Sequence, residues 1–80
     1  MKVLDAGCGT GLYTLSLLKN FPNAQIIAFD YNPDLVTHLK TKLYLSNYSS
    51  RVKLFSADIQ GPLTEINKEV FDFIITNVRT

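Results

Sequence analysis

The sequence predicts one α/β domain built around an open parallel β-sheet. Four short apolar segments have the length and the β-branched or aromatic content of strands, and they alternate with polar or helix-periodic stretches; they cover residues 2–6, 25–30, 52–57 and 71–77. Their apolar runs are continuous rather than strictly alternating, which is typical of strands covered on both faces. Strands that alternate with helices in this way form an open parallel sheet with right-handed crossovers.

The first strand ends in a glycine cluster, and an amphipathic helix is expected after it. Apolar side chains recur there at spacing three and form a stripe that contains Leu12, Leu15, Leu17, Leu18 and Phe21. We expect this stripe to be buried and the helix to end before Pro22.

The start of the second helix is marked more clearly in the sequence than that of the first. Asn32 can cap it, Pro33 occupies the first helical position, and Asp34 complements the positive end of the helix dipole. Its apolar face is expected to contain Leu35, Val36, Leu39 and Leu43. His38 lies away from that face, so we interpret it as solvated surface.

The third connection, residues 58–70, opens with a Gly61-Pro62 turn. Its length is close to the dozen or so residues that a parallel crossover needs, so any helix in it is short. The sequence contains no internal repeat, linker or second domain, and residues 1–80 are expected to form one domain.

Composition and charge exclude several classes of protein. A hydrophobic content of 46% with 19% charged residues excludes intrinsic disorder. Eight basic and seven acidic residues leave a net charge of +1, which disfavours a nucleic-acid partner held by phosphate contacts. Cys8 and His38 are too few for a structural metal site, and none is expected. Without a signal peptide or a long apolar run, the expected location is the cytoplasm, with no membrane contact.

Three of the four glycines fall between the first strand and the first helix, in the segment Asp5-Ala6-Gly7-Cys8-Gly9-Thr10-Gly11. Glycines at such a place permit positive φ and a close approach of a ligand to bare backbone. The spacing differs from the dinucleotide fingerprint G-x-G-x-x-G, which disfavours a nicotinamide-dependent oxidoreductase, and the loop lacks the lysine of a phosphate-binding P-loop.

This segment resembles the first motif, D/E-x-G-x-G-x-G, of class I S-adenosylmethionine-dependent methyltransferases, and three further motifs of that family follow in order. The resemblance covers all 80 residues and implies a Rossmann-like sheet of strand order 3-2-1-4 and S-adenosyl-L-methionine as cofactor. It also implies a set of cofactor-binding residues, namely Asp5, Gly7, Cys8, Gly9, Gly11, Asp30, Tyr31, Asp58, Ile59 and Asn77.

The resemblance gives several of these residues a role. Asp30, at the end of the second strand, would bind the ribose hydroxyls, and Asp58 and Ile59 would contact the adenine. Asn77 would end a strand that faces the methyl group and the acceptor. The chemistry of the cofactor is consistent with these roles. The cofactor has no phosphate and so needs no lysine to bind one, and a carboxylate forms strong charge-assisted hydrogen bonds with ribose hydroxyls. The carboxyl ends of parallel strands, where such sheets bind ligands, are where Gly7, Gly9, Asp30, Asp58 and Asn77 all fall.

Purely structural roles remain possible for some of these residues. Asp5 could cap a turn, Asp30 could cap the second helix, and Asp58 could form an Asx-turn. Cys8 near a helix start could be a reactive thiolate, although a small packed residue is the preferred interpretation. Amine-methylating relatives carry Asn-Pro-Pro-aromatic where this chain has Asn77-Val78-Arg79-Thr80, which disfavours methylation of an amide or nucleobase nitrogen.

The resemblance therefore implies a methyltransferase that acts on an unidentified, small-molecule acceptor, with no residue assigned as general base. The family's domain normally continues through a fifth strand, so we expect a truncated domain. The alternative is a non-catalytic fragment or cofactor-binding module that needs missing segments or a partner. In a truncated domain the fourth strand is an apolar edge without Pro or Lys at Phe73, Ile74 and Ile75. The isolated chain is therefore expected to form a homodimer through this edge or to aggregate.

Overall fold

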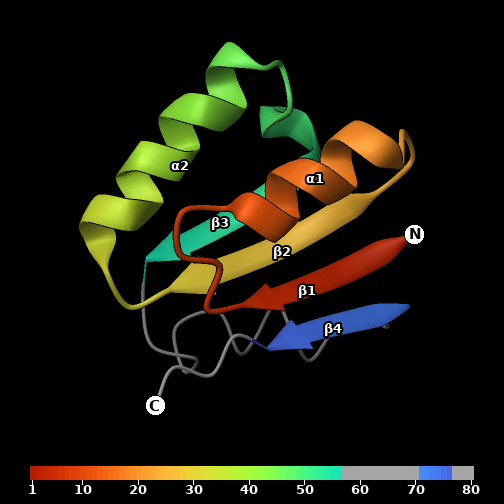
Figure 1. Ribbon diagram of the computed structural model, residues 1–80, viewed down its shortest axis with the longest axis horizontal. Coiled ribbons are helices and arrows are strands. Elements are labelled where there is room, and N and C mark those ends of the chain that lie inside the picture. Colours follow the sequence, from red (N-terminus) through yellow and green to blue (C-terminus); the bar gives the residue numbers. More distant parts are fainter. Residues whose placement is uncertain (57–70, 77–80) are drawn as a thin grey trace.

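The computed structural model describes residues 1–56 and 71–76 and contains a four-stranded parallel sheet (Figure 1). Its strands are β1 (Lys2–Ala6), β2 (Gln25–Asp30), β3 (Val52–Ser56) and β4 (Phe73–Thr76). They lie in the order β3-β2-β1-β4, which confirms the predicted order.

The predicted bounds of the first two strands are confirmed. Residues 57 and 77, predicted as the ends of the other two strands, lie outside the described residues, as does the whole connection 58–70. The last strand starts two residues later than predicted. Asp72 precedes it and accepts a hydrogen bond from the backbone N–H of Lys2 at 2.8 Å.

Helices α1 (Leu12–Asn20) and α2 (Pro33–Leu45) lie on the same face of the sheet (Figure 1). The core between them and the strands is a cluster of buried residues made of Val3, Cys8, Leu18, Ile26, Ala28, Leu39 and Leu43. Alternate strand residues point to the other face, where a second cluster contains Leu4, Ile27 and Phe29. Both faces of the central strands are therefore buried, as the continuous apolar runs predict.

The predicted apolar stripe of α1 is partly wrong. Leu18 is buried, but Leu12 and Phe21 are 71% and 50% exposed. Leu12 lies two residues before Thr14, a rotation of about 200°, which places it on the side of α1 away from the sheet. Phe21 lies just beyond the helix, where its backbone is extended, with φ −127° and ψ 93°. The face that meets the sheet is instead centred on Thr14 and Leu18, four residues apart.

The start of α2 is confirmed in detail. The Asn32 side chain accepts hydrogen bonds from the N–H groups of Asp34 at 2.9 Å and Leu35 at 3.4 Å, and Pro33 is the first helical residue. Val36, Leu39 and Leu43 are buried on its inner face, and His38 is exposed as predicted.

Strand β1 is the point at which the strand order reverses, because the chain moves outward to β2 and β3 and then returns to β1's other side as β4. The carboxyl ends of all four strands meet at one edge of the sheet, and ligands of open parallel sheets bind at that edge, near such a reversal. The glycine loop after β1 lies there (Figure 1).

At the amino ends of the strands, opposite the glycine loop, Arg51 links several segments of the chain. It lies in the 3-10 turn η1 (Ser49–Arg51). Its guanidinium donates three hydrogen bonds to backbone carbonyls at the end of α1 and before β2: those of Leu18 at 3.2 Å, Phe21 at 2.6 Å and Ala24 at 3.1 Å. It also lies 5.6 Å from the centre of the Tyr48 ring. A single side chain thus satisfies carbonyls that the end of a helix leaves without intrahelical partners.

We predict that Arg51→Met lowers the free energy of unfolding by about 2 kcal/mol, because hydrogen bonds to a charged group are worth roughly 1.5–3 kcal/mol. Arg51→Lys should recover only part of this loss, since an ammonium cannot reproduce the planar fork. Urea denaturation measures both. Lys40→Met, which removes an exposed positive charge, is the control. Equal stability of the Arg51→Met and Lys40→Met proteins would contradict the prediction.

Candidate functional site

The glycine loop has a backbone that only glycine adopts without strain. Gly7, Gly9 and Gly11 have φ values of 77°, 55° and 86°. All three lie in the left-handed region, where a side chain is disfavoured. The loop therefore turns the chain sharply from the end of β1 into the start of α1.

The loop is fixed to the end of β2. The backbone N–H groups of Gly7 and Cys8 both donate to the Phe29 carbonyl, each at 2.9 Å. The N–H of Gly9 donates to Asp30 Oδ2, also at 2.9 Å. These bonds bring the first predicted motif and the predicted ribose-binding carboxylate together.

Asp30 does not cap α2 through its side chain, because Asn32 does so. Its Oδ1 instead accepts a hydrogen bond from the backbone N–H of Asn32 at 3.0 Å. The Asp30 carboxylate therefore joins the glycine loop to the turn before α2, and it remains partly exposed.

Gly11 is needed for packing as well as for its backbone angle. A Cβ at this position would lie 2.3 Å from Cδ1 of Leu39 in α2. Since Leu39 is fully buried, it has little room to move away. Gly11 therefore holds α2 against the loop, a role different from direct contact with a ligand.

Asp5 is 1% exposed and accepts a hydrogen bond from the Thr14 hydroxyl at 2.6 Å. Within the described residues, its other oxygen, Oδ1, has no hydrogen-bond partner. Burial raises the pKa of Asp5 above its ordinary value; the Thr14 bond opposes this shift and the negative charge of Asp30 adds to it. Asp5 is thus a buried acceptor beneath the loop rather than an exposed turn cap.

Cys8 packs in the core beneath the loop. Burial, with smaller contributions from the negative charges of Asp5 and Asp30, raises the pKa of its thiol to about 12. The thiol is neutral at physiological pH, which favours the interpretation of Cys8 as a packing residue over that of a reactive thiolate.

The start of α1 lies directly behind the loop. The first N–H groups of a helix lack intrahelical partners, and here no side chain caps them and the first turn has no acidic residue. Exposed side chains follow the two backbone turns: Leu12 and Tyr13 after the loop, and Tyr31, 73% exposed, after Asp30. Asp58, Ile59 and Asn77 lie outside the described residues.

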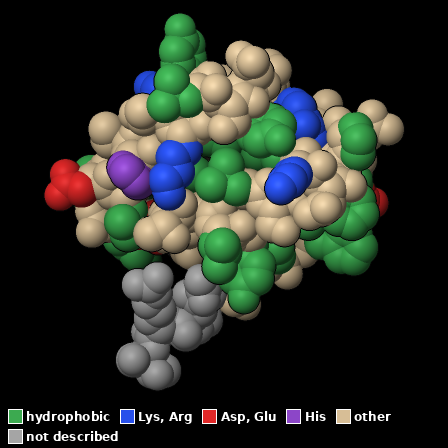
Figure 2. Space-filling model, turned by 45° about the horizontal axis from the view of Figure 1, so that its top comes forward, with side chains coloured by type: hydrophobic (Ala, Val, Ile, Leu, Met, Phe, Trp, Pro, Cys, Tyr) green, Lys and Arg blue, Asp and Glu red, His purple; other side chains and the backbone are tan. Residues whose placement is uncertain are grey.

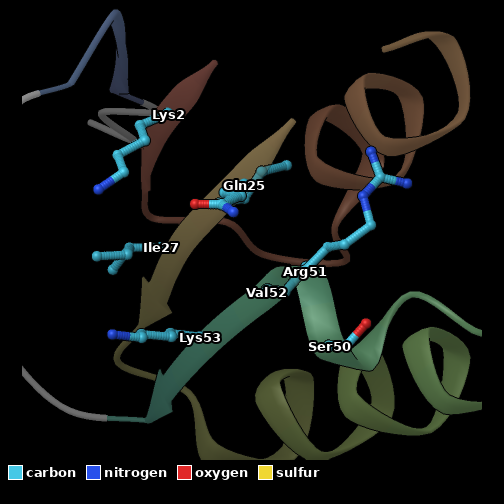
Figure 3. A pocket seen from close by; sticks show the side chains of 8 residues that line it. Lys2, Gln25, Ile27, Ser50, Arg51, Val52 and Lys53 are labelled. Atoms are coloured by element: carbon cyan, nitrogen blue, oxygen red, sulfur yellow. The ribbon is translucent and has the colours of Figure 1, made fainter. Parts of the chain in front are cut away.

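A separate pocket of about 230 Å³ lies at the other end of the strands (Figure 3). Lys2, Gln25 and Lys53 line it near the starts of β1, β2 and β3, so it is distant from the glycine loop along the sheet. Arg51 also borders it, but its guanidinium points toward α1 (Figure 3).

The face seen in Figure 2 carries Lys and Arg side chains at separate places, among hydrophobic and polar atoms, rather than in one basic patch. In residues 1–56 and 71–76, no three His, Cys, Asp or Glu side chains are grouped as metal ligands. None of the helices in the same residues has the length and apolar character of a membrane span.

A family model described as a methyltransferase domain matches residues 3–79. The chain belongs to this family. The fold of this methyltransferase domain also occurs in a solved O-methyltransferase from a trans-AT PKS multienzyme of Brevibacillus brevis, in complex with S-adenosyl-L-homocysteine. The TM-score is 0.69 with 26% identity, over 72% of this chain and 20% of the other.

Two curated relatives differ in the acceptor that their names state. The methyltransferase domain is 33% identical over 76 residues to a malonyl-(acyl-carrier protein) O-methyltransferase of Paenibacillus sp. (strain JDR-2), covering 95% of this chain and 27% of that protein. It is 38% identical over 58 residues to a tRNA1(Val) (adenine(37)-N6)-methyltransferase of Vibrio campbellii, covering 72% and 24%. The chain thus spans about a quarter of the length of each relative.

The sequence patterns did not predict the roles of two residues. Thr14 donates a hydrogen bond to Asp5, and the clue in the sequence is its single hydroxyl on an otherwise apolar face of the helix. Arg51 bonds across 27 to 33 residues of chain, and nothing near it in the sequence indicates this.

We predict that Cys8 resists alkylation in the folded protein. At pH 8 its thiolate fraction should be roughly a thousandfold below that of an unfolded cysteine, whose ordinary pKa is about 8.5. Iodoacetamide labelling followed by mass spectrometry, with and without urea, measures the difference. Because Cys8 is the single cysteine, the urea-treated sample is an internal control. Rapid labelling of the folded protein would show that the thiol is accessible and ionised.

Proposed function

We propose that this methyltransferase domain binds S-adenosylmethionine at the glycine loop, and that the protein transfers the cofactor's methyl group to an acceptor. The observation that carries the proposal is the hydrogen bond between the loop and Asp30. It brings glycine backbone and a carboxylate side by side at the carboxyl ends of β1 and β2. The complex of the similar Brevibacillus brevis O-methyltransferase with S-adenosyl-L-homocysteine supports the choice of cofactor.

Asp30 is suited to the ribose. Each of its oxygens accepts one backbone N–H, and a carboxylate has about four acceptor sites in all. One site on each oxygen is therefore left for a ribose hydroxyl. Such bonds to an ionised acceptor are stronger than bonds between neutral groups.

The electrostatics suit the rest of the cofactor, which carries a sulfonium, an ammonium and a carboxylate. Asp5 and Asp30 are close enough for their negative charges to act on one another and on Cys8, and this negative potential favours the two cationic groups. The N–H groups at the start of α1 favour the carboxylate. In the proposal, Tyr31, Asp58 and Ile59 contact the adenine side, and Asn77 faces the acceptor.

The chemistry of the transfer requires little from the protein beyond positioning. The acceptor's lone pair attacks the methyl carbon while the bond from carbon to sulfur breaks, and the sulfonium becomes a neutral thioether. Holding the two reactants in line supplies much of the acceleration. The nearly balanced charge and the separate basic side chains in Figure 2 favour a small-molecule acceptor over a nucleic acid.

We predict that Asp30→Ala weakens binding of S-adenosylmethionine at least tenfold, which corresponds to about 1.5–3 kcal/mol for a charge-assisted hydrogen bond. Isothermal titration calorimetry measures the dissociation constant. Asp34→Ala removes an exposed carboxylate four residues away, and it should leave binding unchanged. No heat of binding with the wild-type protein, or equal affinities of all three proteins, would overturn the proposal.

We also propose that the 80-residue chain forms a homodimer through β4, which is an edge strand of the described sheet. Phe73 and Ile74 are 60% and 62% exposed there, whereas Ile75 packs on the core. Two copies can pair edge to edge about a two-fold axis.

Accordingly, Ile74→Lys should convert a dimer into a monomer, because a charge on the edge opposes pairing. Sedimentation equilibrium at micromolar concentration measures the mass. Leu45→Lys adds the same charge at a somewhat more exposed place on α2 and should leave the dimer intact. A wild-type monomer would refute this assembly.

A further inference from the structure

The glycine loop depends on one side chain for its conformation. Four of its N–H groups have partners in the described structure: Gly7 and Cys8 bond the Phe29 carbonyl, and Gly11 bonds the Cys8 carbonyl. Gly9, at the centre of the loop, is the one of the four whose partner is a side chain, Asp30. We propose that Asp30 is a positioning residue, which holds the loop in its binding conformation before any ligand arrives.

The contacts of Asp30 require a carboxylate. The N–H groups of Gly9 and Asn32 donate to different oxygens of the same side chain, at 2.9 Å and 3.0 Å. An amide has one oxygen and one NH₂ group, so Asn at this position would turn a donor toward one of these two donors. If the amide oxygen faces Asn32, the N–H of the buried Gly9 lacks a partner away from water. If the oxygen faces Gly9, the bond is kept but is no longer charge-assisted, so it holds Gly9 less strongly.

The two donors belong to different parts of the fold. Gly9 precedes α1, whereas Asn32 caps α2, so the Asp30 carboxylate sets the place of the loop relative to the start of α2. Gly11, two residues after Gly9, already packs on Leu39 of α2. The carboxylate and this packing contact therefore hold the loop against the same helix from two points.

This role is separable from contact with the ribose, which rests on the proposed function. If Asp30 acted only through the ribose hydroxyls, a ligand without those hydroxyls would bind the wild-type and Asp30→Asn proteins equally well. If Asp30 positions the loop, that ligand also binds more weakly to the variant.

The first experiment needs no ligand. Amide hydrogen exchange measured by NMR on the ligand-free protein should show Gly9 exchanging at least tenfold faster in Asp30→Asn than in the wild type. Asp34→Asn is the matched control and should leave Gly9 unchanged, and the amides of Leu18 and Leu39 should report an intact core in all three proteins. Unchanged exchange at Gly9 in Asp30→Asn overturns the inference.

A measurement on the wild-type protein covers the case in which Asp30→Asn does not fold. A through-hydrogen-bond scalar coupling between the Gly9 amide nitrogen and the Asp30 carboxylate carbon should be detectable, and its absence overturns the inference.

The second experiment separates the two roles. S-adenosylhomocysteine and its 2′,3′-dideoxy analogue are titrated into both proteins, and we expect Asp30→Asn to lose at least tenfold in affinity for each. Loss for S-adenosylhomocysteine alone shows that Asp30 acts only through the hydroxyls, and it overturns the positioning role. If the wild type binds neither ligand, the proposed function fails, while the exchange at Gly9 still decides whether Asp30 positions the loop.

Discussion

The structure depends on the hydrogen bonds that tie the loop after β1 to the end of β2. They exist because Ala6 is in register with Phe29, so the chain leaves β1 beside the Phe29 carbonyl and the Asp30 carboxylate. This register is itself fixed by the two-sided core: a shift by one residue would exchange the faces of Val3 and Leu4, which belong to different clusters. The arrangement of the proposed binding site is thus a consequence of how the middle of the sheet packs.

The loop is also supported by buried residues of β1 and α1 that lie beneath it. The Thr14 hydroxyl bonds the buried Asp5 carboxylate, which joins the first turn of α1 to β1. Cys8 fills the core under the loop as a neutral thiol. A buried polar pair and a buried apolar side chain therefore hold the loop in one conformation, so the proposed binding of a ligand would require little rearrangement.

Local patterns predicted most of the described fold, and long-range contacts explain what they missed. Continuous apolar runs located the strands, and Asn32 with Pro33 located the start of α2, because each pattern acts on neighbouring residues. The stripe at spacing three overestimated the burial of Leu12, since three-residue steps drift around a helix, and of Phe21, since the helix ends before it. The sequence pattern predicted that Gly9 and Asp30 lie at the same end of the sheet. Their hydrogen bond, and the bonds of Arg51 to distant carbonyls, depend on tertiary geometry that no local pattern encodes.

The contact between Gly11 and Leu39 has a consequence for any attempt to diversify this domain. The backbone angle at position 11 excludes side chains in its own right, and the isobutyl group at position 39 occupies the space that a Cβ would take. A smaller residue at 39 would remove only the second restriction. Combinatorial libraries should therefore keep position 11 constant and vary position 39 for size alone, since that site sets how closely the second helix approaches the loop.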